Sequence, residues 1–563
     1  MRFALALLAL PLAAARVEPV LLSSFPFTGQ RGQPFTITIR GNGLKEATAV
    51  DAPFPAVVES AETEPSGRNK ADLVRIRISA PAELPPGRYP IRLITPGGLS
   101  NALAVVIAAD PVVPEPEGRH DEPAQAIPAT TLPSIFTGRI DQRGESDLYA
   151  LDVASAGQVL TFECLSGLPA PGAPGGNARG FDPSLVVWEP SGSWFDPKRL
   201  NRLAFNDEPL WVLSQPTDAH LVYRFAKPGR YYLRVEAFSG QGGPDYSYQL
   251  RIAPGDHPPE PAATESGWQE RTSTRRLATT RLNDLAERGG KKPDQKVAET
   301  YRTGPDQTTR VALPANLEGT ISQPGEVHRA SFTLPGPQDL AIEVETPAGA
   351  PPLVNPVVRL LDSRNEEVAT TILAGRGACT GALTKSIQWK VAVPVREPGD
   401  YTVEVRDIVP DLAGPGFRYR VQVRPQVAHL GDIRIDQDHM NLEPGEAKSV
   451  RVVFDREEDY RGAVVVAVEN LPAGVTAMAG ADFEPDKDPP PAKGRRERYS
   501  GRTERTVVVF SAAADAPAMT SPVVARMVVR PLVDGKPGAV IAHKAVPLMV
   551  VSSKPVDKPS AGL

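Results

Sequence analysis

Three copies of the tetrapeptide Pro-Gly-X-Tyr, each followed by alternating apolar residues, constrain the fold of this chain more than any other feature. The copies begin at Pro86, Pro228 and Pro398. Proline fixes the backbone φ angle and glycine tolerates turn conformations, so each copy predicts a tight turn that leads into a half-buried β-strand. Recurrence of this turn–strand unit in three distant segments predicts a string of small β-domains.

Length and composition agree with several β-domains. A chain of 563 residues is longer than one hydrophobic core normally serves. Its 60 prolines are roughly twice the usual share of about 5%, and proline interrupts helices. The net charge of −5 is small for this length, which argues against a general binder of nucleic acid or of anionic membranes. We therefore expect an all-β chain of tandem β-sandwich domains.

The N-terminus predicts export. Arg2 precedes a short apolar run, and Ala13 to Ala15 supply the small residues typical of a cleavage site. We therefore assign residues 1–15 to a secretory signal peptide. No later run reaches about 20 apolar residues, so we expect no transmembrane segment in the mature chain and a disordered tail at 553–563. The expected location is secreted, periplasmic or at the cell surface.

Residues 16–108 form the first predicted domain. Phe35, Ile37 and Ile39 alternate with polar residues, as in a strand with one buried face. This stretch follows a proline- and glycine-marked strand–turn pattern that resembles the immunoglobulin-like IPT/TIG domains of bacterial surface proteins. The resemblance implies an immunoglobulin-like sandwich, followed by a proline- and acid-rich linker at 109–116.

Two related units follow. The segment Gly138–Glu145 matches Gly319–Glu326, and Asp182–Val187 matches Asn355–Leu360. The first copy also carries the run Gly229–Val235. These motifs resemble the bacterial pre-peptidase C-terminal domain, a compact β-sandwich of jelly-roll type. The resemblance places one such domain at 117–253 and a second at 311–425.

The remaining segments differ in character. Residues 254–310 are basic and poor in large apolar residues, with a short amphipathic helix expected around Leu277, Leu282 and Leu285. This segment is either a solvated linker or a docking helix for an acidic partner. Residues 426–552 alternate again and resemble the immunoglobulin-like modules that accompany such repeats.

The chain contains none of the common catalytic motifs. It lacks the zinc-protease helix motif, the nucleophile elbow, the phosphate-binding loop and the dinucleotide fingerprint. We therefore expect a protein that is not an enzyme and has no catalytic residue, although a site assembled from distant residues stays open. Cys164 and Cys379 fall in different predicted domains, and we interpret them as buried or idle thiols rather than a disulfide.

Calcium is the one cofactor to consider, and no other is expected. The pre-peptidase resemblance implies that carboxylates of the acidic entry segment and of one strand could hold it. The matching residues are Glu117, Asp121 and Asp147. Calcium needs several oxygen ligands, but His120 and Gly144 stand where the family has further ligands. The alternative is that these are solvated acids at a sheet edge.

Aromatic residues of the first repeat form a second candidate site. Trp194, Phe195 and Trp211 lie near a predicted turn and could stack on a sugar ring. The alternative is that Trp188 and Trp211 belong to the core and that Trp194 covers an edge.

These patterns predict a non-catalytic secreted or cell-envelope scaffold for interaction or adhesion. Its partner would be an extracellular or envelope protein or a polysaccharide, and not nucleic acid. The alternatives are an extracellular glycan-binding protein, an accessory subunit of a secreted hydrolase or peptidase, or an enzyme with an unrecognised site.

Overall fold

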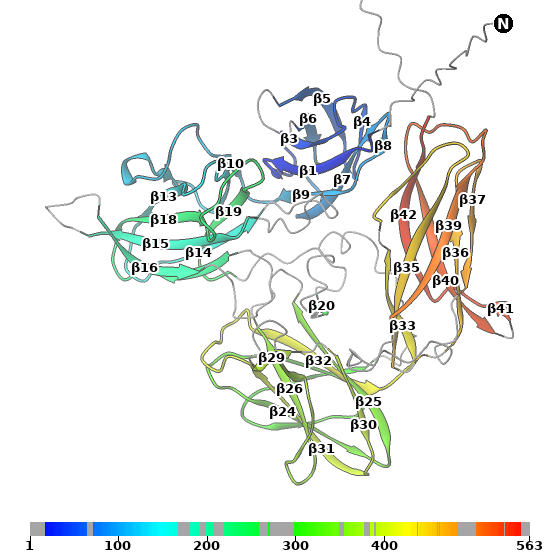
Figure 1. Cartoon of the computed structure of the whole chain (residues 1–563). Helices are drawn as coiled ribbons and strands as arrows, with labels where there is room; N and C mark the ends of the chain where they lie inside the picture. The colour runs from blue at the N-terminus through cyan, green and yellow to red at the C-terminus, as the bar shows by residue number, and fades with distance from the viewer. Residues whose placement is uncertain are drawn as a thin grey trace, which may run out of the picture.

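A computed structural model describes residues 17–64, 71–166, 181–191, 199–206, 219–257, 268–270, 298–347, 354–376, 383–387, 390–435, 437–458, 460, 462–481, 503–533 and 535–552. Among these residues the one helical element is a short 3-10 turn, η1 (Pro123–Gln125). The other elements are β-strands, which form four sandwiches (Figure 1). The expected all-β, tandem-sandwich fold is confirmed. No helix in the described part of the chain is long and apolar enough to cross a membrane.

The first domain packs two sheets around a core of buried aliphatic residues that includes Ile37, Ile76 and Leu93. One sheet has the order β1 (Val20–Phe25), β3 (Pro34–Asn42), β6 (Asp72–Ser79), β5 (Ala56–Thr63). The other has the order β2 (Thr28–Gln30), β9 (Leu103–Ala108), β7 (Gly87–Thr95), β4 (Ala49–Asp51), with β8 (Gly98–Leu99) paired to β7. The strand at 34–42 keeps the predicted alternation, with Ile37 and Ile39 inside.

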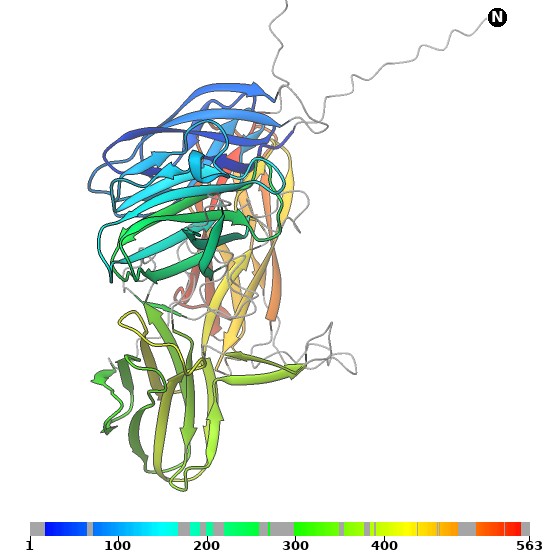
Figure 2. The ribbon, with the colours of Figure 1, turned by 90° about the vertical axis from the view of Figure 1, so that its left-hand side faces the viewer.

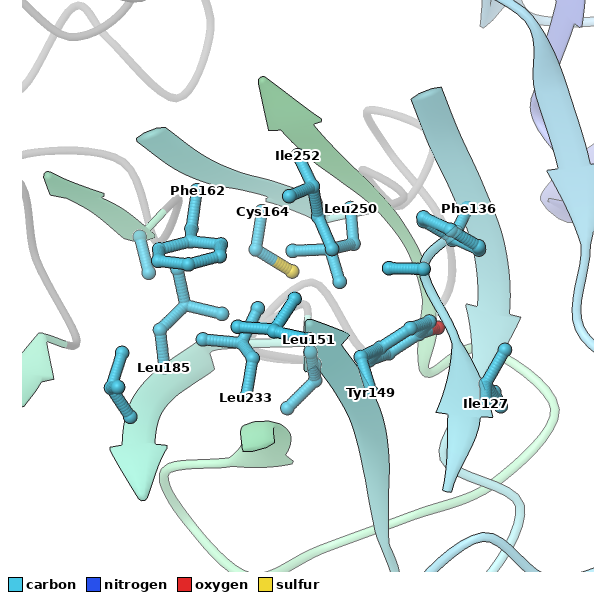
Figure 3. Close-up of a cluster of buried hydrophobic side chains, with 14 of the residues drawn as sticks. Ile127, Phe136, Tyr149, Leu151, Phe162, Cys164, Leu185, Leu233, Leu250 and Ile252 are labelled. Atoms are coloured by element: carbon cyan, nitrogen blue, oxygen red, sulfur yellow. The ribbon is translucent and has the colours of Figure 1, made fainter. Parts of the chain in front are cut away.

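The second domain also packs two five-stranded sheets face to face. The first sheet has the order β10 (Val112–Pro114), β12 (Ser134–Arg139), β19 (Ser247–Pro254), β14 (Val159–Ser166), β17 (Ala219–Arg224). The second has the order β11 (Ile127–Pro128), β13 (Ser146–Val153), β18 (Gly229–Ala237), β15 (Pro183–Pro190), β16 (Leu200–Asn206). Figure 3 shows Tyr149, Phe162 and Leu233 meeting in the core between them, with the Cys164 thiol among them. Cys379 lies outside the described residues.

The third domain repeats this topology and adds β20 and one separate hairpin. Its first sheet has the order β20 (Trp268–Glu270), β25 (Gln338–Pro347), β32 (Arg418–Pro425), β23 (Ala315–Thr320), β21 (Glu299–Arg302), with β30 (Lys390–Val395) also paired to β25. Its second has the order β22 (Thr308–Arg310), β24 (His328–Leu334), β31 (Gly399–Asp407), β26 (Pro356–Leu361), β27 (Glu367–Thr370). A separate hairpin joins β28 (Ile372–Arg376) to β29 (Leu383–Ile387). The shared strand order supports the internal repeat that the sequence motifs predict.

Segments expected to be linkers contribute strands to these two domains. β10 pairs in parallel with β12, and β21 and β22 pair in parallel with β23 and β24. These short edge strands lie inside the predicted linkers 109–116 and 254–310, whose composition conceals them because proline and charge are tolerated at sheet edges. The expected helix around Leu277 lies outside the described residues.

The fourth domain is also a sandwich of two sheets. One sheet has the order β33 (His429–Ile435), β35 (Ala447–Glu457), β39 (Thr503–Ala512), β37 (Val475–Met478). The other has the order β34 (Met440–Leu442), β42 (Ala542–Val550), β40 (Val523–Val533), β36 (Val464–Glu469), β38 (Gly480–Ala481), with β41 (Lys536–Pro537) paired to β40. Val450, Val466 and Phe510 are among the residues of its core.

The three Pro-Gly-X-Tyr turns share one geometry. Strands β7, β18 and β31 each begin at the glycine of the motif. Each tyrosine hydroxyl donates to the carbonyl oxygen four residues earlier: Tyr89 to Pro85 at 2.6 Å, Tyr231 to Lys227 at 3.0 Å and Tyr401 to Glu397 at 2.8 Å. The ring thereby fastens the turn to the strand that follows it. The predicted turn–strand units are confirmed, and this hydrogen bond explains why the motif ends in tyrosine.

Candidate functional site

The residues predicted to bind calcium have separate partners. Asp147 on β13 is 1% exposed, and its Oδ2 accepts a hydrogen bond from the Tyr248 hydroxyl at 2.6 Å. Asp121 is paired with Arg119 at 2.5 Å, and Glu117 is exposed. Within the described ranges, no group of three or more His, Cys, Asp or Glu side chains is arranged to hold a metal ion. Calcium binding stays a prediction.

Asp147 instead belongs to a buried polar centre that the sequence analysis missed. Burial raises the pKa of Glu115 to about 9, with a further contribution from the charge of Asp147. Burial also raises the pKa of Asp147 to about 6. Glu115 Oε2 accepts the Arg139 N–H at 3.0 Å, and His120 Nε2 lies 3.8 Å from Glu115 Oε1. The two carboxyls therefore retain a proton at neutral pH.

The third domain has a corresponding centre with different chemistry. Tyr419 faces Gly319 across β23 and β32, as Tyr248 faces Gly138 across β12 and β19. Its hydroxyl lies 2.7 Å from His328 Nδ1, and His328 occupies the place of Asp147. The imidazole of His328 thus replaces the carboxyl of Asp147, whereas both domains have a tyrosine at the facing position. A buried tyrosine with a changed partner fits a structural role in both repeats.

The residues predicted to bind sugar, Trp194, Phe195 and Trp211, lie outside the described residues. Trp188 is described, and the interpretation of it as a core residue is wrong. It lies on β15 opposite Tyr232 of β18, outside the hydrophobic core cluster. The Arg234 guanidinium covers its ring at 4.7 Å from the centroid, a cation–π contact that shields the indole from solvent.

The most extensive polar chemistry joins domains that are distant in sequence. Between the first and fourth domains, Arg92 of β7 donates from Nη1 to Asp438 Oδ2 at 2.8 Å and from Nη2 to the Asp438 carbonyl at 3.1 Å. Asp438 Oδ2 also accepts the Ala102 N–H at 2.8 Å. The carboxylate is therefore bonded by both a side chain and the backbone of the first domain.

Asn441 completes this joint from β34. Its Oδ1 accepts the Leu99 N–H at 2.8 Å, and its Nδ2 donates to the Leu99 carbonyl at 2.8 Å. The approach is close: a Cβ atom on Gly98 would lie 2.5 Å from Asn441 Cγ, and Gly98 has φ +119°. Ile94, Leu99, Met549 and Val551 form an apolar cluster beside it. We call these contacts, together with Arg92 and Asp438, the first–fourth joint.

The first domain also contacts the second. Thr28 Oγ1 donates to Gln249 Oε1 at 2.6 Å, and Ser23 donates to Asp245. The Arg139 guanidinium lies 4.9 Å from the centroid of the Phe25 ring. One face of the first domain therefore contacts the second domain while β7 and β8 contact the fourth.

The third and fourth domains share a buried ion cluster. Arg424, at the end of β32, is 0% exposed and donates to both oxygens of Glu458, at 2.8 Å and 2.5 Å. Arg424 also bonds Glu343, and Lys390 pairs with Glu458. Burial raises the pKa of Glu458, but the hydrogen bonds from Arg424 and Lys390 outweigh it and bring the pKa to about 2. Glu458 is therefore ionised at neutral pH.

These joints give the domains a spatial order that differs from their order along the chain. Figures 1 and 2 show the first domain beside both the second and the fourth, with the third below the fourth. The partners Arg92 and Asp438 are 346 residues apart. Nothing in the local sequence around either residue marks it as one half of a joint.

No family model matches the chain, and no curated protein matches it. In structure it is similar to SGBP-B of a Bacteroides ovatus mixed-linkage glucan utilization locus, solved with a heptasaccharide (11% identity, 68% of this chain, 72% of that chain, TM-score 0.14). It is also similar to a CBM22 tandem of Paenibacillus barcinonensis Xyn10C (10% identity, 71% and 99%, TM-score 0.13) and to surface layer protein SbsC (10%, 96% and 55%, TM-score 0.16). At such identities and TM-scores, no functional argument rests on these likenesses.

Proposed function

We propose that the protein is a non-catalytic extracellular or cell-envelope scaffold that holds four β-sandwich domains in one arrangement and presents their loops to a protein partner. The observation that carries this proposal is the first–fourth joint. It bonds the N-terminal sandwich to the C-terminal one through Asp438 and Asn441. A chain of independent spacer domains has no need for such a contact.

The use of buried polar groups supports a scaffold rather than an enzyme. In the described ranges, the strongly perturbed acids bond to neighbouring protein groups: Asp147 to Tyr248, Glu458 to Arg424 and Asp438 to Arg92. Catalytic groups, in contrast, have perturbed pKa values at the surface of a cleft. Loops carried on fixed sandwiches are a common way to build a binding surface.

Three finer assignments belong to the same proposal. The second and third domains are pre-peptidase C-terminal domains, the first is an IPT/TIG domain, and residues 1–15 direct export. Their support is the motif resemblance, together with the shared strand order of the two repeats. The spatial arrangement would then serve to present repeated domains outside the cell.

Affinity capture tests the function. Residues 16–563 are immobilised and exposed to envelope and secreted fractions of the producing organism, beside a variant with Asn441→Ala and Arg92→Ala. We expect one protein partner that elutes reproducibly from the native chain and is depleted from the variant. Hydrolysis of peptide, ester or glycoside substrates by the purified chain would overturn the proposal, and a captured hydrolase would assign the accessory role.

Glycan binding is a second candidate, favoured by the outer face of the sheet that contains β15, β16 and β18. Phe205 on β16 is 44% exposed there, on the same face as Tyr232, whereas Arg234 covers the ring of Trp188. Flat aromatic surface is what a sugar ring stacks on. Retention on immobilised polysaccharide should fall in Phe205→Ala and in Trp194→Ala. Equal retention by both variants and the native chain would exclude this role for the two residues.

Calcium is tested in the same preparation. If Glu117, Asp121 and Asp147 bind it, calcium should raise the unfolding temperature of the native chain and a chelator should reverse the effect. Asp121→Asn should remove the response. An unchanged unfolding temperature would leave these residues as surface and core acids.

A further inference from the structure

We propose that the first–fourth joint is a pH-gated latch, in which loss of the proton from His439 removes its contact with Glu18 and loosens the first domain from the fourth while every domain stays folded. The inference rests on the geometry of the joint and does not depend on any partner. The latch adds Glu18 and His439 to Arg92, Asp438 and Asn441 of that joint, and Asn441 Nδ2 also donates to Glu18 Oε1 at 2.7 Å.

His439 lies between two carboxylates that belong to different domains. Its Nδ1 is 2.6 Å from Asp438 Oδ1 in its own domain, and its Nε2 is 3.5 Å from Glu18 Oε1 in the first domain. Nε2 is buried, and no described residue offers it a tighter hydrogen-bond partner. The charged imidazolium can donate from both nitrogens at once, whereas the neutral ring has only one N–H. Neutral His439 can therefore satisfy Asp438 or Glu18, but not both.

Loss of the proton from His439 also removes one of the positive charges that offset the carboxylates of the joint. Arg92 on β7 disfavours the charged ring but is itself paired with Asp438. Lys448 on β35 acts on Glu18, and Asp51 on β4 faces Arg92 with its own pKa raised by burial. With His439 charged, positive groups offset the negative groups of this cluster. With His439 neutral, the Glu18 carboxylate faces an imidazole lone pair across the joint.

The pKa shifts of His439 and Glu18 agree with a joint that is more stable when His439 is protonated. Burial lowers the pKa of His439, but hydrogen bonds to Asp438 and Glu18 outweigh it, so the pKa is raised above the ordinary value. The hydrogen bond to His439, with a further one from Asn441, lowers the pKa of Glu18 to about 2, although burial opposes it. A raised histidine pKa stabilises the closed joint fully below about pH 6.5, and this contribution is lost as pH rises through the raised value. Protonation of Glu18 and Asp438 weakens the joint only in strong acid.

Loss of the proton weakens the joint only in part, because some of its contacts do not depend on the charge of His439. The bonds from Asn441 to Leu99 and Glu18, the Arg92–Asp438 pair and the apolar cluster remain at higher pH. Release should therefore increase the open population by about tenfold for each unit by which closure raises the pKa of His439. The expected behaviour is a shift in an equilibrium, not dissociation of the domains.

Two measurements on the full chain test the latch. The chain has seven histidines, so selective ¹³C labelling of the imidazoles gives a spectrum simple enough to follow each titration. Small-angle X-ray scattering from pH 5 to pH 9 reports the separation of the domains. We expect the radius of gyration to rise with pH, with a midpoint equal to the pKa of His439. Glu18→Gln should lower both this midpoint and the pKa of His439.

The controls separate the latch from general unfolding. His439→Gln should abolish the pH dependence of the radius of gyration, and His543→Gln, on β42 of the same domain, should leave it intact. Unchanged far-ultraviolet circular dichroism across the range shows that the domains remain folded. A radius of gyration that is constant from pH 5 to pH 9, or one that still responds to pH in His439→Gln, overturns the proposal. Neither result bears on partner capture, so failure of the latch is distinguishable from failure of the scaffold function.

Discussion

The side-chain amide of Asn441 bonds both the N–H and the C=O of Leu99, each at 2.8 Å, although 342 residues separate them. An asparagine amide carries one donor and one acceptor face in the same plane, as a peptide group does. Asn441 therefore satisfies the backbone of β8 as a neighbouring strand would, and it does so from another domain. This contact makes the first and fourth sandwiches neighbours in space.

Gly98→Ala should open this joint. The added Cβ would lie 2.5 Å from Asn441 Cγ, and Gly98 has φ +119°. Backbone strain of this kind costs about 1–2 kcal/mol, and the clash adds to it. The matched control is Gly118→Ala, since Gly118 has φ +118° and nothing within 4 Å of its Cβ position. Scattering should show an expanded chain for the first variant only, and equal expansion in both would contradict the role of the contact.

Arg424→Ala should be strongly destabilising. Removing Arg424 leaves two buried carboxylates, Glu458 and Glu343, beside the single charge of Lys390, and breaking a buried pair in this way costs about 3–5 kcal/mol. Arg396→Ala is the control, because Arg396 pairs with Asp339 at an exposed site where the loss is at most about 1 kcal/mol. Urea titration of both variants measures the free energies of unfolding. Similar values for the two would show that the buried cluster contributes nothing specific.

The stability of the second domain should decline as pH rises. The pKa of Glu115 is raised to about 9, so the folded domain holds a proton that the unfolded chain loses near about pH 4.5. The stabilisation is complete below that pH and is lost progressively toward pH 9. Glu115→Gln keeps an acceptor for Arg139 and removes the titration, so its calorimetric transition should shift less between pH 6 and pH 9. Glu117→Gln, at an exposed neighbour, should follow the native chain; a native-like slope in Glu115→Gln would refute the assignment.

Tyr231→Phe should cost about 1 kcal/mol, the usual value of one hydrogen bond, because the hydroxyl that fastens the turn to Lys227 is lost. Tyr232→Phe tests the neighbouring ring, which points to the opposite face of β18. The comparison is made by denaturant unfolding of the full chain. Equal losses for the two variants would mean that the hydroxyl of the Pro-Gly-X-Tyr motif has no special role.

Much of the fold could be predicted because its signals are local. The three Pro-Gly-X-Tyr turns and the period-two alternation of strands such as 34–42 act within a few residues, and the repeat of the second domain in the third is visible as matching motifs. The edge strands β10, β21 and β22 were not predicted, because parallel pairing with a neighbour, rather than their own composition, makes them strands. The alternative that Trp188 belongs to the core is wrong for a similar reason: hydrophobicity does not reveal that Arg234 covers the ring on the outer face.

The sequence alone determined that this protein is a series of β-sandwiches, since turn chemistry and alternation are short-range properties of the chain. Only the tertiary structure decided which polar residues act together. Arg92 and Asp438, Asn441 and Leu99, and Arg424 and Glu458 resemble any other surface residues until folding brings them into contact. The charge and hydrogen-bonding capacity of a residue do not specify which residue it will bond. Burial between two particular domains specifies the partner, because it removes the water that would otherwise satisfy each group.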